Sequence, residues 1–311
     1  MATDTFQKKT DNSPALAVKN GVSPNKLWLP IGDWKTVLEF FQWKFPHLEM
    51  ADCVKRFRHN EVVNDSGEIL TETSQYQPKQ HIYFYRELKE ELQVPFQEKI
   101  IYQNDRILIV DKPHFLPVAP TGQYLHETLL VRLRVQTKID SLELSHRLDR
   151  ETAGLVLLTK QEKYRSHYHQ LFSERKIKKT YHAITKANDA SFPLTYTSQL
   201  SQDKDSMRMK EGNGKHNSET EINLLEQNAN EFLLELIPTS GKKHQLRVHL
   251  ASLGMPIKND PLYPHRRTKA ANDFSHPLQL VAKSLEFIDP IDGQLRCFTS
   301  GYQLDLAPYS S

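Results

Sequence analysis

The segment LSHRLDRETAGLVLLTK, residues 144–160, constrains the fold of this chain more strongly than any other part of the sequence. Residues 155–158 are four apolar side chains in a row, which is typical of a strand buried in a domain core. Directly before them, residues 146–151 include His, Asp, Glu and two Arg. The sequence therefore predicts a buried strand whose start carries a dense group of ionisable side chains.

The remaining patterns favour an α+β fold with a mixed, mostly antiparallel β-sheet. Two strands are predicted around a turn at Asn104 and Asp105, and further strands at 178–186, 231–239 and 277–290. Helical spacing occurs at 127–138, 161–176 and 241–254. Strands outnumber helices and do not alternate with them, which argues against a doubly wound parallel sheet.

Shifts in composition divide the chain into four expected regions. These are a disordered arm (1–26), a small α+β domain (27–90), a charged linker (91–98) and a main domain (99–311). The arm lacks the apolar core of a signal peptide. Within the main domain, the polar residues 201–220 are expected to form a long hairpin or mobile loop.

The small domain is predicted to contain two helices and two strands. Asp33 is a plausible N-cap for the first helix. The second helix, near residues 50–59, carries Lys55, Arg56 and Arg58. This basic cluster either contacts RNA or is an ordinary solvated helix face, and the sequence leaves both interpretations open.

Composition and missing motifs narrow the class of function. Hydrophobic residues make up 38% of the 311 residues and charged residues 25%, so a substantial core is expected. The net charge of +3 permits a nucleic-acid partner without requiring one. The two cysteines lie far apart, which argues against a disulfide scaffold or a cysteine metal site. No run of about 18 apolar residues is present, so we expect no membrane span. No phosphate-loop, GxGxxG, HExxH or GxSxG motif is present, so we expect no nucleotide cofactor or metal. A monomer in the cytoplasm is the simplest expectation.

Asp149 is the first candidate for chemistry. It lies between Arg147 and Arg150, just before the predicted buried strand. A carboxylate flanked by cations stays ionised at neutral pH and can serve as a nucleophile or a base. The alternative is a structural ion pair or a turn cap.

The second candidate is the segment TSGKKHQLRVHLASLG, in which Thr239 or Ser240 is expected to cap a helix that begins near residue 242. Lys242 and Lys243 would then lie at the helix N-terminus, where cations are unfavourable unless an anion such as a backbone phosphate is bound. Gly254 is suited to follow the last turn of this helix.

Two side chains of this helix are expected to share a face. His244 and Arg247 are three residues apart, and a buried Arg would require a carboxylate, for which Asp149 is the obvious candidate. The alternative is a solvated basic helix. His244 and His249 are five residues apart and point in different directions, so they are not expected to bind a metal.

Tyr181 is the third candidate. It follows a basic run at residues 175–179, and aromatic rings interleaved with cations suit a nucleic-acid surface. The alternative is a tyrosine in the core or on the surface of the sheet.

Together these motifs resemble the RluA-type pseudouridine synthases. HRLDRETAGLVLLTK resembles the family signature His-Arg-Leu-Asp followed by Arg/Lys-x-Thr-x-Gly-Leu and an apolar strand. IIYQNDRILIVDKP is similar to the entry hairpin of the family, and KKTYHAI to the segment with its active-site Tyr. SGKKHQLRVHLASLGMPIKNDPLY matches the block Thr-Gly-Arg-x-His-Gln-Ile/Leu-Arg-x-His. The four motifs keep the order of the family over most of the chain.

The resemblance implies an enzyme that isomerises selected uridines in RNA to pseudouridine without a cofactor, on a mixed β-sheet domain with a central cleft. Ribosomal RNA is favoured over transfer RNA as the substrate. Asp149 aligns with the catalytic aspartate, which either attacks the anomeric carbon of the sugar or acts as a base at the ribose. The target uridine must leave the stack, because its glycosidic bond is inaccessible there.

Further roles follow from the same resemblance. Arg247 aligns with the Arg that pairs with the catalytic aspartate, and Tyr181 with the Tyr that stacks on the target base. Arg147 aligns with the Arg that fills the gap left by the flipped nucleotide. Lys242, Lys243 and His244, with the basic cluster of the small domain, are expected to contact RNA. His146 belongs to the family signature and has no assigned role.

The chain departs from the family at two positions. The usual Lys-Pro-x-Gly ends in Phe115 here. Lys242 replaces an Arg, so a point charge stands where the family has a bidentate guanidinium group. These changes bear on substrate choice more than on catalysis. Residues 27–90 are similar, in a degenerate way, to a small RNA-binding domain first described in a ribosomal protein.

Two alternative functions remain open. One is a non-catalytic RNA-binding or ribosome-assembly factor on the same fold. The other is a glycosidase in which Glu151 is the second acid beside Asp149.

Overall fold

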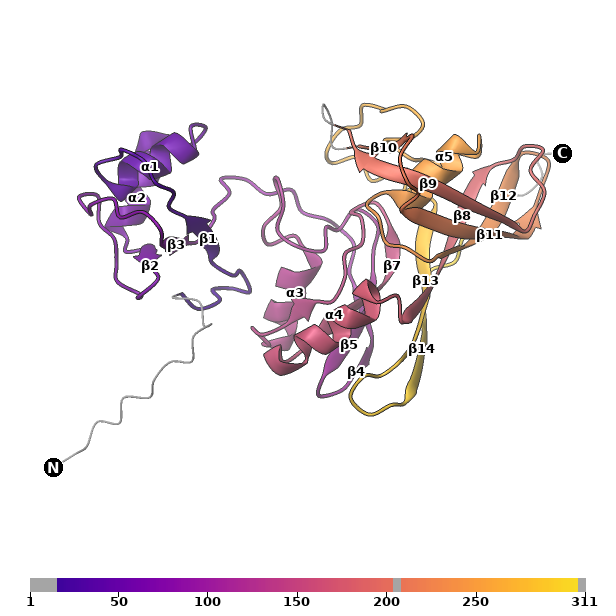
Figure 1. Cartoon of the computed structure of the whole chain (residues 1–311), viewed down its shortest axis with the longest axis horizontal. Coiled ribbons are helices and arrows are strands. Elements are labelled where there is room, and N and C mark those ends of the chain that lie inside the picture. The colour runs from indigo at the N-terminus through magenta and orange to yellow at the C-terminus, as the bar shows by residue number, and fades with distance from the viewer. Residues whose placement is uncertain (1–15, 204–207, 307–311) are drawn as a thin grey trace. The chain divides into compact units, whose positions relative to one another are not determined.

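The computed structural model describes residues 16–203 and 208–306. The chain forms two compact units, Met1–Lys89 and Glu90–Ser311. The small unit contains β1 (Asn25–Trp28), α1 (Val37–Lys44), α2 (Met50–Arg58), β2 (Val62–Asn64) and β3 (His81–Phe84), with the antiparallel sheet order β1-β3-β2 (Figure 1). Two helices and the two predicted strands are therefore confirmed, and a third strand is added.

Three expectations about the first hundred residues are corrected. The N-cap of α1 is Thr36, whose hydroxyl accepts a hydrogen bond from Glu39 N at 3.1 Å, and not Asp33. The expected disordered arm is structured from residue 16 onward, since Val22 is buried and β1 begins at residue 25. The first fifteen residues lie outside the described part. The expected linker, 91–98, belongs to the larger unit, where Val94 is buried in the core.

Strands dominate the larger unit. They are β4 (Lys99–Gln103), β5 (Ile107–Lys112), β6 (Glu143–Leu144), β7 (Ala153–Thr159), β8 (Ile177–Lys186), β9 (Leu194–Gln202), β10 (Met209–Gly212), β11 (Ser218–Gln227), β12 (Glu231–Pro238), β13 (Leu280–Ile288) and β14 (Leu295–Thr299). They form one sheet in the order β10-β9-β11-β12-β8-β13-β7-β5-β4, with β14 beside β13 and β6 beside β7. Among the described strands, the β13–β7 pair alone is parallel. The predicted mixed, mostly antiparallel α+β fold is thus confirmed.

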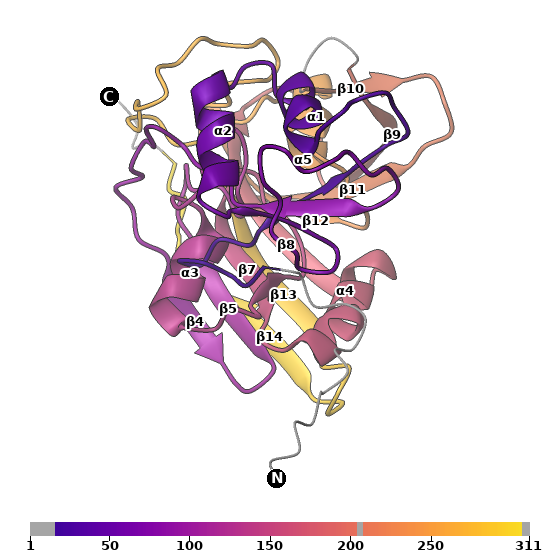
Figure 2. The same cartoon turned by 90° about the vertical axis from the view of Figure 1, so that its left-hand side faces the viewer.

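Helices cover both faces of the half of the sheet that contains β5 and β7. Alternate residues of β5 enter two core clusters: Leu108 and Val110 pack with α3 (Leu129–Thr137), and Ile107 and Ile109 pack with α4 (Arg165–Ser173). The run predicted as a buried strand, in β7, is fully buried for the same reason. A third helix, α5 (Gln245–Ser252), packs on the other half, beside β9, β10 and β11 (Figure 2).

The two halves of the sheet join at β13. Its Val281 and Ala282 pair with Ala153 and Gly154 of β7, and its later residues pair with β14. Gly154 has a φ of +111°, and a Cβ atom built there would lie 2.3 Å from the carbonyl oxygen of Ala282. The join therefore requires glycine at this position.

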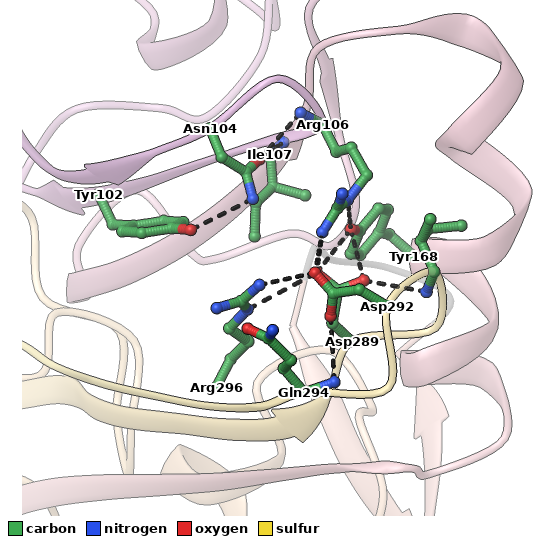
Figure 3. Close-up of polar contacts among 10 residues, drawn as sticks. Tyr102, Asn104, Arg106, Ile107, Tyr168, Asp289, Asp292, Gln294 and Arg296 are labelled. Atoms are coloured by element: carbon green, nitrogen blue, oxygen red, sulfur yellow. Dashed lines mark hydrogen bonds and ion pairs between the residues drawn. The ribbon is translucent and has the colours of Figure 1, made fainter.

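An ion network around the buried Asp289 lies at the C-terminal end of β13 (Figure 3). Asp289, which is fully buried, accepts hydrogen bonds from the Tyr168 hydroxyl at 3.0 Å and from Arg106 Nη2 at 3.2 Å. Arg106 and Arg296 also bind Asp292. The network links the β4–β5 turn, α4 and the β13–β14 turn.

The polar residues 201–220 include regular structure. β9 ends at Gln202, β10 pairs with it through Met209–Gly212, and β11 begins at Ser218. The predicted hairpin is confirmed, although its tip, 204–207, lies outside the described residues. In the part of the chain that is described, no helix combines the length and the apolar character needed to cross a bilayer.

Candidate active site

One row of residues crosses the sheet at the start of β7. The register places Tyr181 of β8 opposite Ala282 of β13, Ala282 opposite Gly154 of β7, and Gly154 opposite Lys112 of β5. Asp149 lies five residues before Gly154, in the turn that leads into β7. The fold thus brings three separate sequence motifs together at the N-terminal end of β7.

A buried lysine, Lys112, holds the backbone beside Asp149. Lys112 is fully buried, and its ammonium donates to the carbonyl oxygens of Pro113 (2.8 Å), Leu116 (2.8 Å) and Arg150 (3.2 Å). Burial lowers the pKa of Lys112 to about 7, and the carboxylates of Glu151 and Asp149 oppose this shift. Three carbonyl acceptors match the three N–H donors of the ammonium form. Lys112 therefore positions the turn that carries Asp149.

His146 holds the same turn from its other end. Its Nε2 accepts a hydrogen bond from Leu157 N of β7 at 3.1 Å, and its ring stacks on Phe172 of α4 with centroids 4.3 Å apart. Burial lowers the pKa of His146 to about 3, so the ring is neutral and can accept this bond. His146, to which the sequence assigned no role, thus connects the Asp149 turn to β7.

Arg247 and Asp149 form the expected pair. Arg247 Nη1 lies 3.2 Å from Asp149 Oδ2. The other edge of the guanidinium binds Asp260, with Nε 2.8 Å from Oδ2 and Nη2 2.6 Å from Oδ1. Burial lowers the pKa of Arg247, but the carboxylates of Asp260 and Asp149 raise it above its ordinary value. Arg247 is 2% exposed, Asp260 1% and Asp149 29%, so Asp149 is the carboxylate of this group that solvent reaches.

Asp260 was missed by the sequence analysis. Its carboxylate also accepts hydrogen bonds from Leu262 N and Tyr263 N, so the turn at 260–263 is built around it. The available signal was a single Asp thirteen residues after Arg247. Sequence spacing alone does not show that such a residue returns to the helix.

His244 and Tyr263 complete the surroundings of Asp149. His244 Nε2 lies 3.8 Å from Asp149 Oδ2, and its Nδ1 lies 2.9 Å from the Tyr263 hydroxyl. Burial lowers the pKa of His244 to about 4, although Asp149 opposes the shift, so the imidazole is neutral at physiological pH. His244 therefore packs into the site as a neutral side chain, and its contact with RNA stays a prediction.

The start of α5 also differs from the prediction. The helix begins at Gln245, and His244 is its N-cap with a left-handed φ of 55°. The predicted caps, Thr239 and Ser240, precede it; Ser240 instead donates to the side chain of Gln245 at 2.8 Å. Lys242 is consequently in the exposed loop before the helix. Gly254 follows the last turn with a φ of +73°, as predicted.

Tyr181 lies where two core clusters meet and is half-buried. Burial, and then the charge of Asp149, raise the pKa of Tyr181 to about 12, so its phenol stays protonated at neutral pH. Its aromatic ring is therefore available beside the carboxylate as a neutral group.

The predicted RNA-contacting cations fall into two groups. Arg147, Lys242, Lys243, Lys55 and Arg58 are exposed, although Arg58 forms an ion pair with Glu72. Arg56 is buried at 6% exposure, donates to the carbonyl oxygen of Tyr85 and lies 3.7 Å from Glu87. The prediction that Arg56 contacts RNA is therefore wrong. Its neighbours Cys53 and Phe57 are buried on the same face of α2.

A family comparison decides the class of protein. Residues 106–252 match the family of RNA pseudouridylate synthases. Over these residues the chain is similar to the RNA pseudouridylate synthases. Several relatives are named as ribosomal large subunit pseudouridine synthase C, which supports the resemblance to the RluA type.

The names of individual relatives refer to different RNAs. The ribosomal large subunit pseudouridine synthase C of Vibrio cholerae is 33% identical over 195 residues, 61% of this chain and 61% of that protein. The mitochondrial tRNA pseudouridine(32) synthase of Saccharomyces cerevisiae is 30% identical over 171 residues, 53% of this chain and 37% of that protein. The alignments thus span less than two thirds of either relative.

A solved structure supports the fold of the larger unit. Human RNA Pseudouridylate Synthase Domain Containing 1 matches with a TM-score of 0.55 and 21% identity, covering 66% of this chain and 84% of the human one. The family match contains Asp149, Tyr181 and Arg247 and ends before Asp260 and Tyr263. In the described residues, no three His, Cys, Asp or Glu side chains are grouped as metal ligands.

Proposed function

We propose that the protein isomerises uridine to pseudouridine in RNA, with Asp149 as the reactive carboxylate. The arrangement of Asp149, Arg247 and Tyr181 carries the proposal: a solvent-accessible carboxylate is fixed by a buried guanidinium beside a neutral phenol. A protein on this fold that had lost catalysis and only bound RNA would have no need of this arrangement.

The reaction conserves all atoms of the nucleotide. The bond from ribose C1′ to uracil N1 breaks, the base turns, and C1′ bonds to C5; C5 loses a proton and N1 gains one. Asp149 either attacks C1′ or acts as a base at the ribose while the first bond breaks. Arg247 keeps the carboxylate oriented, and the ring of Tyr181 stacks on the flipped base.

RNA is the proposed partner of both units. Extruding the uridine costs a few kcal/mol, and Arg147, which is exposed and two residues before Asp149, is proposed to fill the space left in the stack. Lys55 and Arg58 of the small unit, with Lys242 and Lys243 near the site, are proposed to contact phosphates. We also propose that the protein acts in the cytoplasm and as a monomer.

Ribosomal RNA is the proposed target, with transfer RNA as the alternative. The name of the Vibrio cholerae relative supports the first and that of the yeast relative the second. Mapping pseudouridines in all cellular RNA, with and without the gene, distinguishes them: the sites that disappear identify the target.

Replacing Asp149 by Asn tests the role of the carboxylate. The variant should bind RNA and form no pseudouridine in single-turnover reactions with unmodified transcripts. Glu151→Gln is the matched control, since Glu151 is the neighbouring carboxylate and pairs with Arg150 at 3.0 Å; it should stay within about tenfold of the wild type. Full pseudouridine formation by Asp149→Asn would refute the assignment. Loss of activity in Glu151→Gln alone would favour the glycosidase-like use of two acids.

Complementation tests the non-catalytic alternative. If Asp149→Asn forms no pseudouridine yet fully restores the phenotype of cells that lack the gene, the biological role is RNA binding or ribosome assembly. We expect no restoration of the modification and, where the phenotype depends on it, no rescue.

A further inference from the structure

We propose that residues 264–268 form a phosphate-binding loop that holds the RNA backbone beside the target uridine. The proposal rests on the proposed function and extends it to a segment outside the family match, which ends at residue 252. The loop has the sequence PHRRT. Its two ends are fixed to the protein and its middle carries exposed cations.

The first end of the loop is fixed at Tyr263. The Tyr263 hydroxyl accepts from Met209 N at 2.7 Å, donates to Met209 O at 3.1 Å and contacts His244 Nδ1 at 2.9 Å. The guanidinium carbons of Arg247 and Arg208 lie 5.4 Å and 4.8 Å from the centre of its ring. Arg208 also donates to the carbonyl oxygen of Pro264 at 2.7 Å. The loop therefore leaves directly from residues that surround Asp149.

The second end is fixed at Lys269 and Phe274. The Lys269 ammonium lies 5.0 Å from the centre of the Phe115 ring and donates to the carbonyl oxygen of His276 at 3.3 Å. The ring of Phe274 contacts Phe115 with centroids 5.3 Å apart. Phe115 itself is buried with a left-handed φ of 67°, a conformation that a bulky residue rarely adopts. The protein keeps Phe115 in spite of this unfavourable backbone conformation, which indicates that the aromatic side chain is needed at this position.

The middle of the loop presents cations with no carboxylate partner. His265, Arg266 and Arg267 are exposed, and in the described residues none of their side chains forms a hydrogen bond or an ion pair. No Asp or Glu occurs from residue 261 to residue 272. Arg106 and Arg296, by contrast, are held by aspartates (Figure 3). Adjacent unpaired arginines on a fixed backbone suit phosphate, which guanidinium groups bind in a bidentate manner.

The position of the loop selects the ligand. Asp260, just before the loop, binds Arg247, which binds Asp149, so the loop begins four residues after the carboxylate that anchors the Asp149–Arg247 pair. A nucleotide that is flipped to reach Asp149 brings its flanking phosphates to this surface, and phosphate contacts fix the register of an RNA without reading its sequence. The RNA backbone is thus the ligand that the proposal commits to.

The test is the double substitution Arg266→Ala with Arg267→Ala. Filter binding and single-turnover release of tritium from C5 of uridine are measured on unmodified ribosomal and transfer RNA transcripts over a salt series. We expect affinity to fall about tenfold or more, and the slope of log K against log salt to drop by roughly 1.4 to 1.8, which is two phosphate contacts. The rate at saturating enzyme should stay within about threefold of the wild type, because no reacting group is removed.

Two matched variants keep the proposal falsifiable. Arg266→Lys with Arg267→Lys retains the charge and should keep most of the salt slope. Lys163→Ala with Lys186→Ala removes the same charge from two exposed lysines outside the loop, and should change affinity less than threefold. The proposal is overturned if the alanine double variant binds as the wild type does, or if the Lys163 and Lys186 control loses as much affinity.

The outcome separates this proposal from the proposed function. If the wild type releases no tritium, the isomerase assignment fails, whereas the RNA affinities over the salt series still test the role of the loop. If the wild type is active and the alanine variant retains its affinity and slope, the loop fails alone. Thermal unfolding of each variant checks that the exposed substitutions leave the fold intact.

Discussion

Replacing Asp260 by Asn should reveal how much the buried carboxylate contributes to the site. In the structure, Asp260 Oδ1 accepts from Arg247 Nη2, Leu262 N and Tyr263 N, and Oδ2 accepts from Arg247 Nε at 2.8 Å. An Asn side chain has the same shape and can keep the Oδ1 contacts. Its amide group, however, would face the Nε–H of Arg247, where two donors meet and no hydrogen bond forms.

The expected loss can be bounded from these contacts. One charge-assisted hydrogen bond contributes about 1.5–3 kcal/mol, and removing one partner of a buried ion pair costs about 3–5 kcal/mol. Asp149 still contacts the same guanidinium at 3.2 Å and partly compensates its charge. We therefore expect the free energy of unfolding to fall by about 3 kcal/mol, a large fraction of the roughly 5–15 kcal/mol that stabilises a typical domain.

Catalysis should suffer as well, because Arg247 loses the partner that fixes its plane. A displacement of about 1 Å at a reacting group can cost roughly a hundredfold in rate, so we expect the single-turnover rate to fall about 10- to 100-fold. Urea denaturation and single-turnover kinetics measure the two effects. Asp305→Asn, at an exposed carboxylate, is the control and should remain within about 0.5 kcal/mol. An Asp260→Asn protein with wild-type stability and rate would show that Asp149 alone holds Arg247.

Three further predictions follow from single residues. Gly154→Ala should destabilise the larger unit by about 3 kcal/mol or more in urea denaturation, because its Cβ would lie 2.3 Å from Ala282 O at a φ of +111°; an unchanged midpoint would contradict the close strand join. Phe115→Gly relieves a left-handed backbone worth about 1 kcal/mol but empties a buried aromatic site worth about 3–5 kcal/mol, so net destabilisation with weaker RNA binding is expected, and a more stable variant would refute it. His249 is fully buried with its pKa lowered by burial to about 4, so the unfolded chain binds an extra proton between pH 6.5 and 4. As the pH falls through that window, His249 should contribute about 3 kcal/mol to the loss of unfolding free energy, beside the similar contributions of His146 and His244; an equally steep loss in His249→Gln would contradict this.

The sequence was most informative where local pattern and tertiary environment agree. The apolar run of β7 was correctly predicted to be buried, because α3 and α4 cover the two faces of this part of the sheet. The pairing of Arg247 with Asp149 was also predicted and is confirmed, since an inward-facing Arg on an amphipathic helix has few possible partners. The catalytic and RNA-contacting roles of these residues stay predictions.

The errors have specific physical causes. The helix caps were misplaced because several Asp, Ser and Thr residues precede each helix, and only the backbone decides which one is used: Thr36 caps α1, and a left-handed His244 starts α5. Arg56 was counted with an exposed basic face, although its spacing to Cys53 already placed it on the buried side of α2. Asp260 could not be found locally, because its role arises from a chain reversal after α5.

Asp149 is held by two parts of the chain that meet at a single strand join. Lys112 and His146 fasten its turn to β5 and β7, whereas Arg247, with Asp260 behind it, comes from the other half of the sheet. The two halves are connected beside the site through the pairing of Gly154 with Ala282. The distance between carboxylate and guanidinium therefore depends on the register of β7 against β13. The ion network around Asp289 lies after the opposite end of β13, where it ties this strand to Arg106 and α4 at a distance in sequence from the Gly154–Ala282 pair (Figure 3).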